Sequence, residues 1–213
     1  DLKMTIITND PAKRYYYTLL FGDKYRVKIA TRNVNIPGIQ NFRDLGGYPS
    51  YSTKKQVRWG MIYRSAEIDS LECYSRRELR NLGIKTLIDL RASSETGRQS
   101  PLQKEFNVVH IPLATGDMEN ILKGIREEKI KSDTVYRMVE QMNRDLIDKY
   151  TTEYRQIFDI LLDKNSYPVV IHCSSGKGRT GIVSALVLAA LGINEDIIME
   201  DYRLSNDYFN IPS

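Results

Sequence analysis

The sequence predicts an α/β protein with a central, largely parallel β-sheet flanked by helices and a small β-rich appendage at the N-terminus. From residue 41 onward, short apolar segments typical of buried strands alternate with segments whose apolar residues recur at helical spacing. Before residue 36 the chain is rich in aromatic and β-branched residues and shows no helical pattern. We therefore expect an appendage over residues 1–35 and an α/β domain over residues 36–213.

Length and composition are those of an ordinary globular protein: 213 residues, 41% of them hydrophobic and 27% charged. A formal net charge of +4 suits an anionic substrate but is too small to indicate a nucleic-acid-binding protein. No apolar run reaches the roughly 18 residues of a membrane span, so no integral membrane segment is expected. Because the chain begins with Asp1, we expect a trimmed or processed protein, located in the cytoplasm or exported with its signal removed. Its oligomeric state is left open.

The first expected element is a β-hairpin. Residues 15–21 are aromatic and β-branched, residues 22–24 supply a Gly-Asp-Lys turn, and residues 25–29 alternate between polar and apolar side chains. The Pro-Gly pair at residues 37–38 then marks a boundary.

The α/β region is expected to open with a strand over residues 57–63 and a helix over residues 75–82. Ser75 is the expected N-cap of this helix because Glu78 follows three residues later, as in a capping box, and Gly83 is its expected stop. The remaining elements are expected to be strands at residues 85–90, 108–113 and 169–172, and helices at residues 133–163 (broken near residue 151), 178–191 and 194–205.

The segment with the strongest chemical signal is His-Cys-Ser-Ser-Gly-Lys-Gly-Arg-Thr-Gly, at residues 172–181. It lies between an expected strand and an expected helix, where backbone N–H groups converge and can hold an anion. Glycines permit close approach of the backbone, and the planar fork of an arginine suits two phosphate oxygens at once. The expected phosphate-binding residues are Ser174, Ser175, Gly176, Lys177, Gly178 and Arg179.

Cys173 lies at the floor of this loop, six residues before Arg179, where a thiolate is favoured. A thiolate beneath a bound phosphate is placed to attack phosphorus. Thr180 is expected to donate its hydroxyl to the sulfur, and His172 to orient the loop backbone. A plain glycine-rich turn with a buried cysteine does not account for these neighbours, and the Walker A pattern is not met.

The sequence contains only one other cysteine, Cys73, so it carries no disulfide framework, and no Cys/His set has the spacing of a zinc site. Cys73 is expected in the core, where free cysteines are commonly buried. A bridge between Cys73 and Cys173 is the less favoured alternative.

Residues 173–180 match the C-x-x-x-x-x-R-[ST] signature of the cysteine-based phosphatases in full. Three upstream segments extend the match: Asn-Phe-Arg-Asp-Leu-Gly-Gly-Tyr at 41–48, Trp-Gly-Met-Ile-Tyr-Arg-Ser-Ala at 59–66, and Leu-Gly-Ile-Lys-Thr-Leu-Ile-Asp-Leu-Arg at 82–91. Over about residues 36–210 the chain thus resembles the bacterial tyrosine-phosphatase family that carries an N-F-R-D-L-G-G segment. The resemblance implies the cysteine-phosphatase fold and hydrolysis of phosphomonoesters through a phosphocysteine, with no metal or other cofactor.

This chemistry also needs a general acid, and here the sequence departs from the family pattern. Members often have Asp immediately before the loop arginine, where this chain has Gly178. We expect Asp117 to be the acid, because it lies in a loop after a predicted strand; capping a helix that starts at Met118 is its alternative role. Asp145 and Asp148 rank lower, as surface residues of a predicted helix.

Two further pairs of charged residues are expected near the site. Arg43 and Asp44 are expected to form a structural or substrate-edge pair, and Gly46-Gly47 a tight turn. Asp89 and Arg91 end a predicted central strand, where α/β sites collect, so they are either site residues or a buried ion pair.

Three functions remain open. A phosphotyrosine or dual-specificity protein phosphatase needs a deep slot, whereas a phosphoinositide or inositol-phosphate phosphatase needs a wider, more basic mouth. Lys177 resembles the loops of the second class, but the second loop lysine usual there is Ser174 here, which favours the first. The third function, a non-catalytic phosphate-binding module, is disfavoured by the intact cysteine, arginine and threonine. The expected partner is a phosphorylated protein, a phosphorylated peptide or an inositol phosphate.

Overall fold

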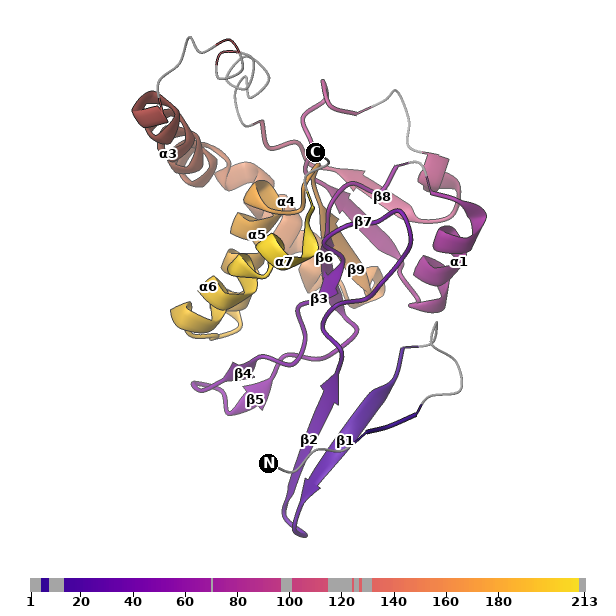
Figure 1. The fold of residues 1–213 in the computed structure, drawn as a ribbon. Coiled ribbons are helices and arrows are strands. Elements are labelled where there is room, and N and C mark those ends of the chain that lie inside the picture. The colour runs from indigo at the N-terminus through magenta and orange to yellow at the C-terminus, as the bar shows by residue number, and fades with distance from the viewer. Residues whose placement is uncertain are drawn as a thin grey trace.

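The computed structural model describes residues 5–7, 14–69, 71–96, 101–114, 124, 127 and 132–210. Its strands are β1 (Tyr16–Phe21), β2 (Tyr25–Ala30), β3 (Arg43–Asp44), β4 (Pro49–Ser50), β5 (Lys55–Gln56), β6 (Ile62–Ser65), β7 (Thr86–Asp89), β8 (Asn107–His110) and β9 (Val169–His172). Its helices are α1 (Cys73–Asn81), α3 (Ser132–Lys149), α4 (Thr151–Leu162), α5 (Gly178–Ala190), α6 (Glu195–Arg203) and α7 (Ser205–Tyr208), with the 3-10 turns η1 (Pro101–Lys104) and η2 (Lys164–Ser166). Figure 1 shows their arrangement.

The central sheet has five strands in the order β3-β6-β9-β7-β8. Strands β6, β9, β7 and β8 run parallel to one another, and β3 pairs antiparallel with β6 at the edge. The middle strand β9 is apolar and fully buried along Val169–Ile171, as expected for a parallel strand covered on both faces. The predicted α/β class with a largely parallel sheet is therefore confirmed.

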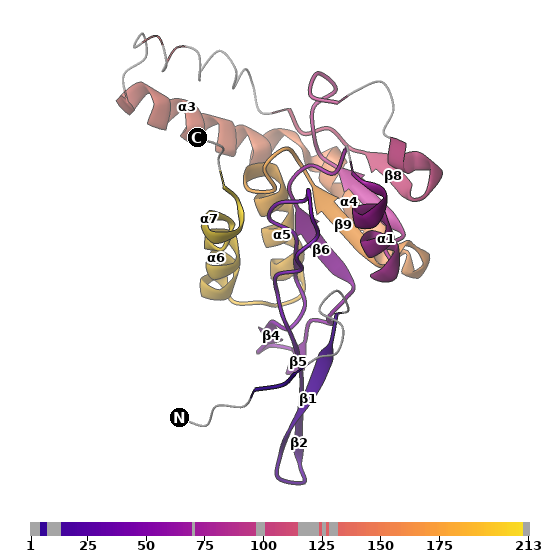
Figure 2. The same ribbon diagram turned by 45° about the vertical axis from the view of Figure 1, so that its right-hand side comes forward.

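Helices cover both faces of the sheet, with α4, α5 and α6 on one side and α1 on the other (Figures 1 and 2). Because side chains alternate along a strand, β9 serves two cores. Val169 and Ile171 belong to the cluster that includes Val183 of α5, whereas Val170 belongs to the cluster that includes Leu79 of α1. Within the described residues, no helix combines the length and apolar character needed to cross a membrane.

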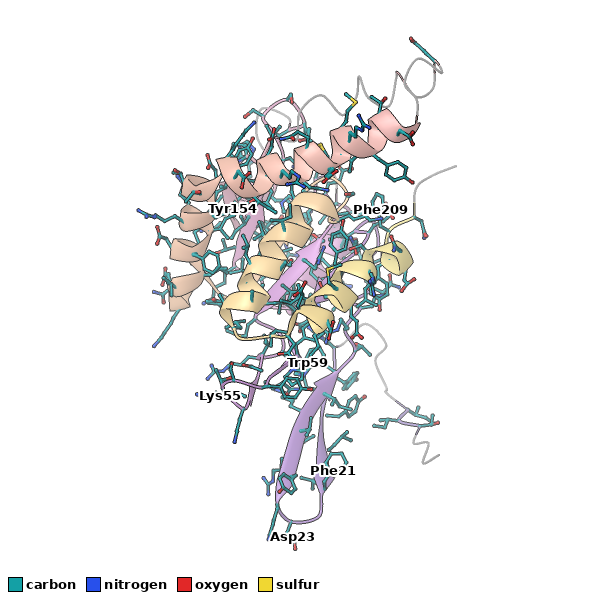
Figure 3. All side chains as sticks on the ribbon, turned by 90° about the vertical axis from the view of Figure 1, so that its left-hand side faces the viewer. Phe21, Asp23, Lys55, Trp59, Tyr154 and Phe209 are labelled. Carbon is teal, nitrogen blue, oxygen red and sulfur yellow. The ribbon has the colours of Figure 1, made fainter. Side chains whose placement is uncertain are left out.

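The predicted hairpin is confirmed: β1 and β2 pair antiparallel, and the hairpin projects away from the sheet (Figures 1 and 2). Figure 3 shows Phe21 near the far end of the hairpin and Trp59 at its base. The base is tied to the body, because the Trp59 ring nitrogen donates to the Lys28 carbonyl at 2.9 Å. Arg14, just before β1, also forms an ion pair of 2.7 Å with the buried Asp44.

The predicted capping box of α1 is wrong. The helix begins at Cys73 with Glu72 at the N-cap position, and Ser75 lies inside the first turn. The Ser75 hydroxyl instead donates to the carbonyl of Pro37 at 2.6 Å, a tertiary contact that local spacing does not reveal. The predicted stop is correct, since Gly83 follows the helix with a φ of 72°, a left-handed value that favours glycine.

The predicted burial of Cys73 is also wrong. The buried face of α1 is formed by Ser75, Glu78 and Leu79, and Cys73 lies outside this face and is exposed. Both cysteines are free, so the Cys73–Cys173 bridge is absent.

Several predicted elements end earlier or divide. The strand expected over 57–63 is instead β6, which follows Gly60 with its φ of 78°, and the strand expected over 108–113 ends at His110 as β8. The predicted break of the long helix near residue 151 is confirmed, since α3 and α4 are separated at Tyr150, whose φ of −112° and ψ of 31° are not helical. The last predicted helix divides into α6 and α7.

Arg43 and Asp44 do not pair with each other, contrary to expectation. They are adjacent in β3, where successive side chains point to opposite faces. Asp44 accepts from the backbone N–H groups of Gly46 at 2.7 Å and Gly60 at 2.6 Å, in addition to its contact with Arg14. Asp44 therefore organises the turn at Gly46-Gly47 and the base of the hairpin.

Arg43 instead shares a buried carboxylate with Arg64. Asp201 of α6 lies 3.3 Å from Nε of Arg43 and 2.6 Å from Nη1 of Arg64, and it accepts from the Tyr48 hydroxyl at 2.9 Å. Burial alone would raise the pKa of Asp201, but the charges of Arg64 and Arg43 outweigh it and hold this pKa below its usual value. The ionised carboxylate thus joins β3, β6 and α6.

We predict that Asp201→Asn lowers the free energy of unfolding by about 3 kcal/mol, because it leaves buried arginine charges without a counter-ion. The change would be measured as a shift in the urea midpoint. Glu200→Gln, at an exposed position of the same helix, is the control and should change it little. Equal stability of Asp201→Asn and the wild type would contradict the structural role of this ion pair.

Candidate active site

The cysteine loop lies at the carboxyl edge of the parallel strands, where β9 ends at His172 and α5 begins at Gly178. Gly176 has a φ of 66°, and a Cβ built there would lie 2.3 Å from the carbonyl oxygen of Ser65. Only glycine fits this point of the loop, because it needs both a left-handed backbone and close approach to β6.

Three backbone carbonyl groups of the loop accept hydrogen bonds from donors that lie outside the loop. The carbonyl of Gly176 accepts from Nη2 of Arg64 at 2.8 Å, that of Ser175 from Nδ2 of Asn41 at 3.0 Å, and that of Ser174 from a backbone N–H at 3.1 Å. In a planar trans peptide the carbonyl and the following N–H point in opposite directions. Holding the carbonyls of Ser174 and Ser175 outward therefore turns the N–H groups of Ser175 and Gly176 inward, as an anion-binding nest requires. The N–H of Lys177, which follows the Gly176 carbonyl, donates to the Ser175 hydroxyl at 3.3 Å.

Cys173 and Arg179 are brought together, as the sequence predicts. The Cys173 side chain is 1% exposed and belongs to the core cluster that contains β9. The Arg179 guanidinium lies beside it. Burial lowers the pKa of Arg179, but hydrogen bonds to Glu95 and the charge of Cys173 outweigh burial and raise this pKa above its usual value.

Glu95 is a site residue that the sequence analysis missed. Both Nη groups of Arg179 donate to its carboxylate, with a distance of 2.8 Å from Nη2 to Oε1. The Ser174 hydroxyl donates to the same oxygen at 2.6 Å and accepts from Arg179 Nη2 at 3.1 Å. Glu95 thus fixes the plane of the guanidinium and the first residue after the cysteine.

These hydrogen bonds keep Glu95 ionised. The bond from Arg179 is the main cause that lowers the pKa of Glu95 to about 2, against the opposing effect of its partial burial. A carboxylate with a lowered pKa loses its stabilising contact only as the pH falls towards that value. The Glu95–Arg179 pair therefore persists throughout the neutral and mildly acidic range.

A sequence signal for Glu95 does exist. It follows Arg91 by four residues, just after β7 reaches the same edge of the sheet as β9. Acidic side chains at this edge are candidates for site residues, but nothing in local spacing names Arg179 as the partner.

Asp89 and Arg91 form a buried ion pair, which is one of the two roles expected of them. Oδ2 of Asp89 lies 2.6 Å from Nη2 of Arg91. Arg91 also binds Asp69, so its guanidinium lies between two carboxylates. Burial would raise the pKa of Asp89, but its hydrogen bonds from Arg91 hold this pKa below its usual value.

His172 is fully buried directly before the cysteine. Burial lowers the pKa of its imidazole to about 4, so the ring is neutral at physiological pH. Its Nδ1 lies 3.9 Å from Asp89 and has no hydrogen-bond partner among the described residues. The expected role of His172 in orienting the loop backbone stays a prediction.

Thr180 lies in the first turn of α5 and is completely buried. Within the described part of the chain its hydroxyl has no hydrogen-bond partner, so the expected bond to the Cys173 sulfur is not formed in this structure. Lys177 lies in the loop and donates to the side-chain oxygen of Asn206 at 2.7 Å. Gly178 begins α5.

The expected acid, Asp117, lies outside the described residues. Asp145 and Asp148 lie on α3, and Asp145 binds Lys149 on the same helix at 2.8 Å. This contact lowers the pKa of Asp145. The prediction that Asp145 and Asp148 are surface residues of a helix is therefore confirmed.

The sequence profile of the tyrosine phosphatase family matches residues 34–212. A similar relative is the triple specificity protein phosphatase PtpB of Mycobacterium tuberculosis, 32% identical over 194 residues that cover 81% of this chain and 68% of PtpB. A tyrosine-protein phosphatase of Nostoc commune is 26% identical over 148 residues, 68% of this chain and 48% of that protein. The solved catalytic core of Siw14 matches with a TM-score of 0.45 and 16% identity over 67% of this chain and 69% of that chain.

The chain therefore belongs to the tyrosine phosphatase family, as a protein-tyrosine-phosphatase-like enzyme that hydrolyses phosphomonoesters. The expected family, fold and enzymatic activity are confirmed. The alternative of a non-catalytic phosphate-binding module is set aside.

We predict that Glu95→Gln lowers kcat/KM by about tenfold to a hundredfold, because hydrogen bonds between charged groups are each worth about 1.5–3 kcal/mol. The measurement is the hydrolysis of p-nitrophenyl phosphate. Glu105→Gln, which removes a carboxylate bound to Arg76 and Arg80 on the surface, is the matched control and should keep wild-type kinetics. Wild-type kinetics in Glu95→Gln would show that Arg179 needs no support from this carboxylate.

Proposed function

We propose that this phosphatase acts on phosphotyrosine in proteins, with Cys173 as the nucleophile and Arg179 as the phosphate clamp. The observation that carries the proposal is a buried thiol beside a fixed guanidinium, at the base of a loop whose carbonyls are held outward. Such a loop binds the phosphate oxygens, and it stabilises the charge that develops on them in the transition state.

In the first step the Cys173 sulfur attacks phosphorus, and the bond from phosphorus to the leaving-group oxygen breaks. The oxygen departs with a proton from the general acid, and the phosphoryl group remains on sulfur. In the second step a water molecule attacks phosphorus and gives its proton to a general base. The phosphorus–sulfur bond breaks, and inorganic phosphate and the thiolate are released.

Thr180 is the residue that we propose to stabilise the sulfur in both steps. Its buried hydroxyl has no partner among the described residues, and an unmet buried donor is unfavourable. A thiolate at Cys173 supplies an acceptor to that donor. The hydroxyl therefore favours the thiolate before attack and again when it leaves.

The depth of the thiol supports phosphotyrosine as the preferred ester. Cys173 is 1% exposed, so the phosphorus must reach it at the base of the loop. A phenyl ring is a long, rigid spacer that carries phosphate to such a depth, whereas the short side chain of phosphoserine would bring the peptide backbone against the rim.

An inositol phosphate is the second candidate, supported by Lys177. Besides Arg179, it is the one cation that residues 173–180 supply, and Asn206 holds it by the hydrogen bond from its ammonium group. A single lysine at this position offers less positive charge than a polyphosphate headgroup would use, so we rank this substrate second.

A substrate panel tests the preference. We predict that kcat/KM for a phosphotyrosine peptide exceeds the values for a phosphoserine peptide and for inositol phosphates by at least about tenfold, since a misplacement of ~1 Å alone can cost about a hundredfold. Cys173→Ser assayed in parallel controls for contaminating phosphatases. A higher value for an inositol phosphate would replace the proposed substrate with the second candidate.

Asp117 is the proposed general acid. This proposal is supported because two described carboxylates near the loop are unsuitable as acids. Glu95 and Asp89 both have lowered pKa values and are held by arginines, so they do not carry a proton at neutral pH. The carbonyl of Leu113 lies 3.5 Å from Arg179. Four residues of chain can span up to about 14 Å, so the length of chain after Leu113 is compatible with Asp117 serving the loop.

We predict that Asp117→Asn slows hydrolysis of a phosphotyrosine peptide by about a hundredfold or more, the usual contribution of acid catalysis. It should affect an aryl ester with an acidic leaving group much less, because that group departs without a proton. The basic limb of the pH–rate profile should flatten. Asp148→Asn, at an exposed position of α3, is the control, and equal losses of Asp117→Asn on both esters would exclude Asp117 as the acid.

A further inference from the structure

A cavity lies at the opposite end of the sheet from the cysteine loop. It has a volume of 590 Å³ and opens between the β4–β5 hairpin, the start of β6 and the end of α5. Helix α5 joins the two ends of the molecule, with Gly178 in the loop and Ala190 at the cavity. At a rise of 1.5 Å per residue, these two positions are separated by roughly 18 Å. A ligand in this cavity would therefore not contact the phosphate site.

The floor of the cavity is apolar. Met61, Ile62 and Leu191 line it, and Ile62 and Met61 also pack into the core cluster beneath. The Tyr167 ring forms part of the wall, and its hydroxyl donates to the carbonyl of Leu161, which fixes the ring. These contacts give the floor a definite shape before any ligand binds.

The hairpin wall is also held in place. Gly192 follows α5 with a φ of 75°, and a Cβ built there would lie 2.3 Å from Oγ of Ser52 and 2.8 Å from Oγ of Ser50. Glycine at this point lets the hairpin lie directly against the end of the helix. Ser50 is itself buried, so the hairpin is packed rather than free at its base.

The charge around the cavity is entirely positive. Lys55, Arg58 and Lys164 line it, and no aspartate or glutamate does. Figure 3 shows Lys55 on the hairpin. None of the three cations has a carboxylate partner among the residues that the structure describes. The buried arginines of the fold, such as Arg43 and Arg64, are by contrast paired with acids.

We propose that this cavity binds an amphipathic anion, a small molecule with an apolar body and one carboxylate, sulfonate or phosphate group. Its volume falls within the range of about 300–1,000 Å³ typical of small-molecule sites. The apolar floor accepts the body of the ligand, and the three cations attract its charged group. Binding does not compete with phosphate, because the two sites lie at opposite ends of α5.

Anilinonaphthalene sulfonate is a suitable probe, because it is an amphipathic anion that fluoresces on entering an apolar site. Titration of the full chain should show one saturable site, and excess orthovanadate bound at the cysteine loop should not displace the probe. Neutral phenylnaphthylamine and inorganic sulfate should each bind at least about tenfold more weakly, because each lacks one of the two features that the cavity recognises.

Three variants locate the site. Arg58→Glu and Lys164→Glu should each weaken probe binding by at least about tenfold through charge repulsion, and Ala190→Phe should abolish it by filling the cavity. Lys104→Glu and Arg155→Glu, at exposed cations that do not line the cavity, should bind as the wild type does. All five variants should hydrolyse p-nitrophenyl phosphate at the wild-type rate, which confirms folding.

Displacement of the probe by orthovanadate, unchanged binding in the three cavity variants, or no saturable binding to the wild type would overturn the proposal.

Discussion

The geometry of the phosphate-binding loop depends on one buried ion pair. Asp201 binds Nη1 of Arg64 at 2.6 Å, and Nη2 of the same guanidinium donates to the carbonyl of Gly176 at 2.8 Å. A buried arginine charge is stable only when a counter-ion is close to it, so the carboxylate on α6 fixes where this guanidinium lies. The guanidinium in turn fixes the loop. A residue that touches no substrate therefore helps to fix the position of the loop backbone at Gly176.

A second carboxylate also acts on the site. Glu95 holds the guanidinium of Arg179, as Asp201 holds that of Arg64. One carboxylate orients the backbone that surrounds the phosphate, and the other orients the side chain that clamps it. Donors that are fixed before the substrate arrives need no reorganisation during the reaction, which is the physical basis of electrostatic catalysis. The fold thus uses one buried and one partly exposed carboxylate to organise a site for a negatively charged substrate.

The sequence was sufficient to predict the elements whose signals are local. The apolar strand β9, the glycine-rich turn after it and the spacing of Cys173 and Arg179 lie within about twenty residues of chain. Features that depend on distant partners were missed or mistaken. Arg43 pairs with Asp201, 158 residues away, rather than with its neighbour Asp44, and Glu95 binds Arg179 across 84 residues. Ser75 resembled an N-cap, but its hydroxyl binds the carbonyl of Pro37. A single sequence shows that a charged or polar residue needs a partner without showing which partner the fold supplies.

The central claim is that phosphate passes through a covalent bond to the buried sulfur of Cys173. The most direct test is to mix the wild-type enzyme with excess substrate, stop the reaction in acid during steady-state turnover, and map the modified peptide by mass spectrometry. The account predicts one phosphoryl group on the peptide that contains residues 172–181, carried by the cysteine and absent when Cys173 is replaced by serine. Efficient turnover with no phosphorylated cysteine, or with the phosphoryl group on another residue, would contradict it.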